Sequence, residues 1–195
     1  MTLSLSNAPP KALGFVNEFV PMFLGEEWND KHLEIVKPYP LYTFALNDVI
    51  DGRPLAAALL SAWEFLIVDG ESVVAMAEIC ARDADGKEDL SYATLHPRSY
   101  ATAIAETIAA AEVLPEVADT PFELRLLRAP SLSLLAIWLH RADDDLLFPV
   151  RPLRDNVALM RTVWNDRDAI NGEEALTQVL RPVAELRLNA QDFGG

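Results

Sequence analysis

The chain has 195 residues, 51% of them hydrophobic, and a formal net charge of −14. We expect a single domain, 1–195, with a sizeable core. An acidic surface disfavours binding to nucleic acids and to anionic membrane surfaces, because both carry negative charge. We find no signal peptide and no run of about 20 apolar residues that would span a membrane. Cys80 is the only cysteine, which excludes an internal disulfide and favours the cytoplasm.

The negative charge is concentrated in the first two thirds of the chain. Residues 1–124 contain 20 acidic and 7 basic side chains, a balance of −13, whereas residues 125–195 contain 10 and 9, a balance of −1. An acidic surface for a basic partner is one interpretation of this asymmetry, and charge that keeps the protein in solution is the simpler one.

The first part of the chain is predicted to contain a tail, a helix and a short strand. Small or polar residues at 4 and 6–8, followed by Pro9 and Pro10, predict a flexible tail over residues 1–10. Apolar residues at helical spacing predict an amphipathic helix over 11–23. The Pro-Tyr-Pro sequence at 38–40 indicates an extended link. A short strand over 42–46 and a turn or single helical turn over 47–53 follow.

An antiparallel meander of three strands is predicted next, over 63–68, 73–81 and 90–96. Asp69-Gly70 favours a two-residue hairpin turn between the first two strands, since both residue types tolerate positive φ. Residues 82–89 are polar and are expected to form the loop before the third strand.

A helix should follow the meander. Pro97 suits its first turn, where a missing N–H costs nothing, and the helix should end near residue 113. The residues expected to face the core are Ala101, Ile104, Ala105, Ile108 and Ala111.

Two or three further strands are predicted between 122 and 150. Residues 122–128 alternate between apolar and polar side chains, as in a half-buried strand. The run Leu134–Leu139 is continuously apolar, which indicates that the strand over 132–140 is central and covered on both faces. A strand over 146–150 should pair next, and Pro149 places it at an edge.

The last part of the chain is predicted to be helical. A short helix is expected over 156–164 and a longer one over 172–188, capped by Asn171 and kinked at Pro182. The apolar stripe of the longer helix comprises Leu176, Val179, Leu180, Val183 and Leu186.

These elements predict an α+β fold, with helices packed on a mostly antiparallel sheet made of a three-strand meander, a helix and two or three further strands. The element order over roughly 11–188, together with the acidic charge, resembles the secretion-chaperone-like fold. That fold includes type III secretion chaperones and the bacterial sensory-transduction-regulator family. The resemblance implies a small, acidic and often dimeric protein. It includes no sequence motif, so it assigns no site residue.

Three histidines, His32, His96 and His140, are present. His96 and His140 stand at the ends of predicted strands, where each is either a general base or a structurally satisfied histidine. With a right-handed crossover, the strand over 122–128 would run parallel to the strand over 90–96. The two histidines would then lie at opposite ends of the sheet, about 20 Å apart. A shared catalytic site is therefore not expected.

Two acidic clusters invite comparison with cation sites. Asp83–Asp89 lacks the glycine and glutamate spacing of a calcium loop, which favours a hairpin loop. Asp143–Asp145 is either a site for a hard cation or, more simply, a solvated turn. Cys80 lies between Ile79 and Ala81, so a buried inert thiol is favoured over a nucleophile.

Glu64 and Glu78 lie in neighbouring predicted strands and are a candidate pair of catalytic carboxylates. Pairing about Asp69-Gly70 puts Glu64 opposite Ala75, and alternation then sends Glu78 to the other face. The two carboxyls should meet only if a bulge intervenes.

The sequence contains no recognisable catalytic set, and we predict no catalytic residue, no metal site and no cofactor. We therefore expect a cytoplasmic, non-enzymatic protein-interaction domain, chaperone-like or regulator-like. Its partner is another protein or a second copy, as in a homodimer, and not a nucleic acid or a membrane. The alternative is a small-molecule enzyme that uses His96 or His140 with a carboxylate. A deep polar pocket at either histidine would favour the enzyme.

Overall fold

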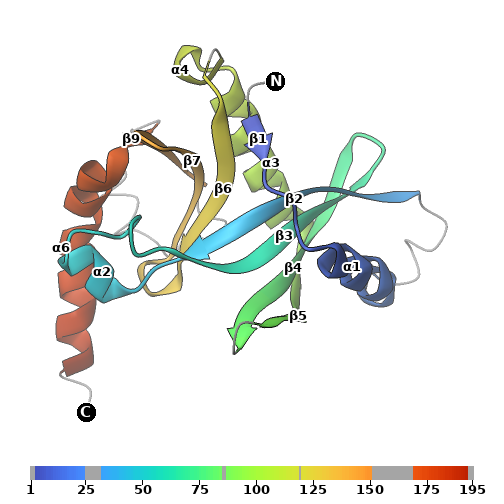
Figure 1. Cartoon of the computed structure of the whole chain (residues 1–195), viewed down its shortest axis with the longest axis horizontal. Coiled ribbons are helices and arrows are strands. Elements are labelled where there is room, and N and C mark those ends of the chain that lie inside the picture. The colour runs from blue at the N-terminus through green and yellow to red at the C-terminus, as the bar shows by residue number, and fades with distance from the viewer. Residues whose placement is uncertain (1–2, 25–31, 85–86, 119, 151–168, 193–195) are drawn as a thin grey trace.

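The computed structural model describes residues 3–24, 32–84, 87–118, 120–150 and 169–192. They form an α+β fold in which a curved, mostly antiparallel sheet carries helices on both faces (Figure 1). This confirms the fold class expected from the sequence.

All nine described strands belong to one sheet. Its strand order is β5-β4-β3-β2-β6-β7-β8-β9, and β1 pairs with β6 beside this path. Among the described strands, the pairs β2–β6 and β1–β6 are parallel and the others are antiparallel. The strands in chain order are β1 (Leu3–Leu5), β2 (Leu33–Thr43), β3 (Leu59–Asp69), β4 (Ser72–Ala84), β5 (Lys87–His96), β6 (Phe122–Ala129), β7 (Leu134–Arg141), β8 (Asp144–Pro149) and β9 (Ile170–Asn171).

Four helices, α1, α2, α3 and α6, pack on the two faces of the sheet. On one face lies α3, with Ile104 in its core; on the other, α6 and α2 pack on β6–β8, and α1 packs on β3 and β4 through Val16. Figure 1 places α6 and α1 at opposite ends of the molecule. The helices are α1 (Pro10–Phe23), α2 (Leu46–Ile50), α3 (Arg98–Glu112), α4 (Pro115–Ala118), the 3-10 turn η2 (Pro130–Leu132) and α6 (Gly172–Asp192).

The apolar run at 134–139 forms the central strand that its composition predicts. It becomes β7, which pairs with β6 on one side and β8 on the other. Ile137 and Leu139 face the core under α3, whereas Ala136 and Trp138 face the core under α6. Coverage of both faces explains why this strand carries no charged side chain between 134 and 139.

The two long predicted helices, over 97–113 and 172–188, are present as α3 and α6. The stripe of α3 is buried at four of its five positions, and Ala105 is half-buried. In α6 the stripe is buried from Leu176 to Val183, but Leu186 is 57% exposed. Figure 1 shows the reason, since the C-terminal end of α6 extends past the sheet. Asn171 lies in β9, paired with Leu146.

Two predictions for the N-terminal part are wrong. Residues 1–10 are not simply a tail, because Leu3–Leu5 form β1 and pair with β6. The link at 38–40 lies inside β2, an 11-residue strand, rather than before a short one. Pro38 lies where β2 breaks its register with β3, between Val36 and Pro38, so the ladder is already irregular there, whereas Pro40 pairs with Trp63 in regular register.

The meander is present, but its strands are longer than predicted. Residues 82–84 and 87–89 of the polar segment belong to β4 and β5 rather than to a loop, because their backbones continue the pairing of the hairpin. Residues 85–86 and the helix predicted over 156–164 lie outside the described residues.

After α3 the chain enters the sheet as β6, and the direction of this strand relative to β5 differs from the predicted one. β6 pairs with β2 and β7 instead of lying beside β5, and it runs antiparallel to β5. The strand over 144–149 is also not a simple edge, because β9 pairs with it at Leu146 and Leu147. Pro149 lies beyond that short pairing, where its missing N–H breaks no bond of the described ladder.

Candidate functional site

Five polar side chains meet on the face of the sheet that α3 covers. Glu64 comes from β3, Glu78 from β4 and His96 from the end of β5. Tyr100 lies in the first turn of α3, and Arg128 near the end of β6. We call these five residues the α3-face cluster. Glu64 and Glu78 are charged residues within apolar strands, and both are buried.

Glu64 and Glu78 are direct partners in the β3–β4 ladder, contrary to the sequence-based pairing. The turn residues are Gly70-Glu71, because Asp69 pairs with Ser72, which shifts the register by two residues. A bulge in the hairpin shifts it by one more. The three-residue shift places Glu78 rather than Ala75 opposite Glu64, so the two carboxyls share a face.

Glu78 is held by two cationic or donor side chains. Arg128 donates from both terminal nitrogens, Nη1 to Oε2 and Nη2 to Oε1, each at 2.7 Å. Nε2 of His96 lies 2.8 Å from Oε2. Desolvation is the largest single effect on Glu78 and would raise its pKa. The bonds and charges of Arg128 and His96 outweigh it and lower the pKa to about 2.

Glu64 is completely buried and less well compensated. Its Oε1 accepts a hydrogen bond of 2.9 Å from the hydroxyl of Tyr100 and lies 4.0 Å from Nε2 of His96 and 3.9 Å from Nη1 of Arg128. Its Oε2 has no hydrogen-bond partner in the part of the chain that the structure describes. Burial raises the pKa of Glu64 to about 7, despite the nearby His96 and Tyr100.

Arg128 and Tyr100 were not among the residues singled out from the sequence. A signal for Arg128 was available, because it continues the buried alternation of Phe122, Leu124 and Leu126 on one face of β6. A charge on a core-facing position requires a partner. Tyr100 carried no comparable signal, since an aromatic residue in a first helical turn is ordinary.

Three members of the α3-face cluster have the donor types that bind metal ions. One ligand atom each of Glu64, Glu78 and His96 lies within 4.8 Å of the others. No metal site was predicted, because the ligands come from three strands and have no short spacing in sequence.

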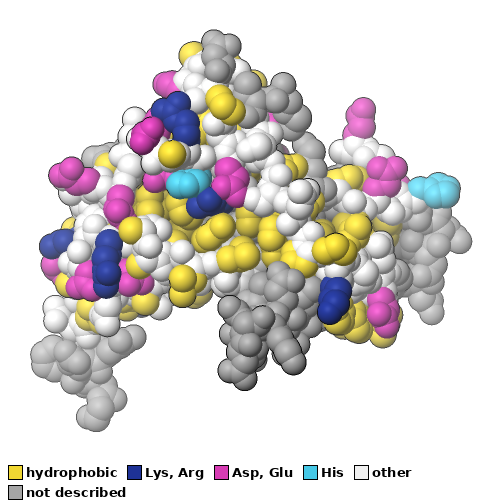
Figure 2. Space-filling view, in the orientation of Figure 1, with side chains coloured by type: hydrophobic (Ala, Val, Ile, Leu, Met, Phe, Trp, Pro, Cys, Tyr) yellow, Lys and Arg dark blue, Asp and Glu magenta, His cyan; other side chains and the backbone are white. Residues whose placement is uncertain are grey.

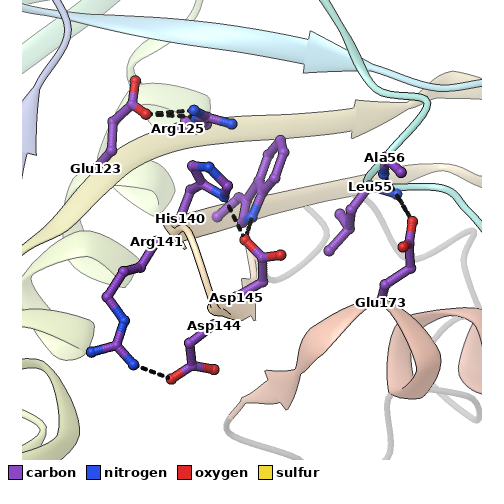
Figure 3. A network of polar contacts seen from close by, with 10 residues as sticks. Leu55, Ala56, Glu123, Arg125, His140, Arg141, Asp144, Asp145 and Glu173 are labelled. Atoms are coloured by element: carbon purple, nitrogen blue, oxygen red, sulfur yellow. Dashed lines mark hydrogen bonds and ion pairs between the residues drawn. The ribbon is translucent and has the colours of Figure 1, made fainter.

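His140 belongs to a second group, on the opposite face (Figure 3). Its Nδ1 lies 2.8 Å from Oδ1 of Asp145, and Nε1 of Trp138 donates to the same oxygen at 2.6 Å. The guanidinium of Arg125 lies 4.8 Å from the ring centre of Trp138 and donates from Nε to Glu123 at 3.0 Å. Each polar group named here therefore contacts a neighbouring side chain.

His96 and His140 do not share a partner. Arg128, which contacts the same carboxylate as His96, pairs with Leu135, whereas His140 pairs with Glu123 at the other end of β6. Alternation along β6 also puts the two groups on opposite faces of the sheet. The topology assumed in predicting this separation is wrong, but the two histidines do belong to separate groups.

Neither His96 nor His140 lines either of two cavities found among the described residues. One, of about 750 Å³, lies along the polar side of α6 beside Gly52. The other, of about 240 Å³, lies between α3 and the sheet, and Tyr39 and Glu112 line it. Burial raises the pKa of Tyr39 to about 12.

The remaining candidates show no converging chemistry. Cys80 is half-buried in β4, and His32 is exposed before β2. Asp143 lies in the turn between β7 and β8, while Asp144 pairs with Arg141 at 3.3 Å. Asp83 and its acidic neighbours flank the β4–β5 hairpin.

Comparisons with known proteins give no match to a family model, a curated protein or a solved structure. Among the described helices, none combines the length and apolar character needed to cross a membrane.

Proposed function

We propose that this protein is a non-enzymatic, cytoplasmic protein-interaction domain, chaperone-like or regulator-like, that binds another protein or a second copy of itself. The observation that carries the proposal is that α1 has apolar side chains on two sides. Ala12, Val16 and Val20 pack against the sheet, whereas Leu13 and Met22 are 45% and 69% exposed.

When a helix is apolar on only one side, packing that side on the protein leaves mainly polar side chains in solvent. α1 has two charged residues, Lys11 and Glu18, both of which are exposed, and Phe23 at its end is also exposed. Exposed large apolar side chains on one helix favour a surface for a protein partner. Figure 2 shows further hydrophobic side chains across the middle of this face of the molecule.

The enzyme alternative rests on one specific observation, the 2.8 Å contact between His96 and Glu78. A histidine held by a carboxylate is the arrangement of many general bases. Against it, Arg128 already donates hydrogen bonds to both oxygens of Glu78. We therefore rank this function second.

The experiment places a photo-crosslinking amino acid at position 22, on the exposed side of α1. A matched control has the same amino acid at position 106, an exposed site on α3. We expect a discrete protein adduct from position 22 only, in living cells of the source organism. An adduct of twice the chain mass would identify the partner as a second copy.

The captured partner is then purified, and its affinity for the chain is measured directly. Leu13→Glu should weaken binding about tenfold or more, because it places a charge in the apolar contact, while an unchanged melting temperature verifies the fold. Equal adducts from both positions, or an affinity unaffected by Leu13→Glu, would contradict the proposal.

A further inference from the structure

We propose that Glu64, Glu78 and His96 form a binding site for one divalent transition-metal ion, with Zn²⁺ and Mn²⁺ as the closest fits. The inference concerns the α3-face cluster and is independent of the protein-interaction surface on α1.

The distances suit a common ligand sphere. Nε2 of His96 lies 2.8 Å from Oε2 of Glu78 and 4.0 Å from Oε1 of Glu64. Bonds from zinc to nitrogen and oxygen are about 2.0–2.2 Å, so two ligands of one ion lie roughly 3–4 Å apart. An ion would replace the hydrogen bond between His96 and Glu78, with neutral imidazole offering its Nε2 lone pair.

The charges of the cluster call for an additional cation. Two buried carboxyls face a single permanent positive charge, on Arg128, and a proton must supply the rest when no ion is present. Oε2 of Glu64 is buried without a hydrogen-bond partner in the described chain. An unsatisfied oxygen on a completely buried carboxyl is costly, and an ion bound to Oε2, with Oε1 still accepting from Tyr100, would satisfy it.

Arg128 and Tyr100 would act as outer-shell partners of the ligands. Each carboxylate oxygen has two lone pairs, so Oε2 of Glu78 can accept from Arg128 and still bind an ion. Tyr100 orients Glu64 through its hydroxyl. Such partners fix the geometry of ligating carboxylates. With both carboxyls ionised the loaded site has one excess positive charge, which an anionic ligand from solvent would cancel.

The donor set favours transition metals over Mg²⁺ and Ca²⁺. Imidazole suits zinc and related ions, whereas the hard cations prefer oxygen ligands alone. The side chain of His96 is 19% exposed, which gives the ion an entry path.

The test is equilibrium dialysis of chelator-treated protein against Zn²⁺ or Mn²⁺, with metal content measured by mass spectrometry. We expect one equivalent bound, a raised melting temperature, and no comparable effect of Mg²⁺. Glu64→Gln and His96→Gln should each weaken binding about tenfold or more. His140→Gln, which breaks the other histidine–carboxylate pair, is the matched control and should bind normally.

A second measurement uses only the native chain, so it does not depend on how the variants fold. Diethyl pyrocarbonate modifies accessible histidines, and peptide mass spectrometry locates the modification. Zn²⁺ should protect His96 and leave His140 reactive. Absence of stoichiometric binding, equal protection of both histidines, or loss of binding in His140→Gln alone would overturn the proposal.

Discussion

Glu64→Gln should remove much of the pH dependence of stability near neutral pH. The pKa of Glu64 rises from 4.5 to about 7 in the folded protein. Because the raised value belongs to the folded state, the associated stability is complete below pH 4.5 and is lost as pH rises through 7. A difference of about 2.5 units corresponds to roughly 3 kcal/mol. Gln is uncharged and keeps an oxygen that can accept from Tyr100, so it should not lose this stability.

The assay is urea denaturation followed by tryptophan fluorescence at pH 5 and pH 8, with a chelator present so that no metal ion contributes. Relative to Glu64→Gln, the native chain should lose about 3 kcal/mol between the two pH values. Glu106→Gln, at an exposed position on α3, is the control and should behave like the native chain. Parallel pH profiles for the native chain and Glu64→Gln would refute the reasoning.

Two further predictions concern acid stability and the packing of α6. The pKa of Glu78 is lowered from 4.5 to about 2, so its contribution is present above 4.5 and should be lost as pH falls toward 2. Glu78→Gln should therefore reduce the loss of stability at acid pH, which an acid titration followed by fluorescence would measure. An equal loss in the native chain and in Glu78→Gln would argue against the contacts that Glu78 makes with Arg128 and His96. Leu180→Ala should destabilise by about 2–5 kcal/mol, because Leu180 is completely buried. Leu186→Ala, 57% exposed on the same helix, should cost less than about 0.5 kcal/mol, and equal losses in urea would mean that α6 is not docked as described.

Local patterns predict several elements of this fold well. β7 follows from its apolar run, β6 from its alternation, and α3 and α6 from their stripes. Each of these patterns lies within one segment, and it reflects the burial of one or both faces of that strand or helix. Most of β2 was missed because its prolines are poor strand residues, although Pro38 lies where the pairing with β3 is irregular.

The α3-face cluster could not be predicted, for two physical reasons. The bulge decides whether Glu64 and Glu78 share a face, because a register change of one residue inverts the answer, whereas the turn offset changes which residue lies opposite Glu64. The position of β6 beside β2, which brings Arg128 to the cluster, is a long-range choice that no local pattern encodes. The buried charges themselves were visible in the sequence, and each implies a partner.

The contact between Glu78 and Arg128 tests the central claim most directly. β3 and β2 lie between their strands, so a flat sheet would separate the backbones by about 14 Å. The contact therefore depends on the strand order and on curvature toward α3. The measurement is a double-mutant cycle with Glu78→Gln and Arg128→Met, in urea at pH 7. We predict a coupling of about 2 kcal/mol or more, and additivity within about 0.5 kcal/mol would contradict the arrangement.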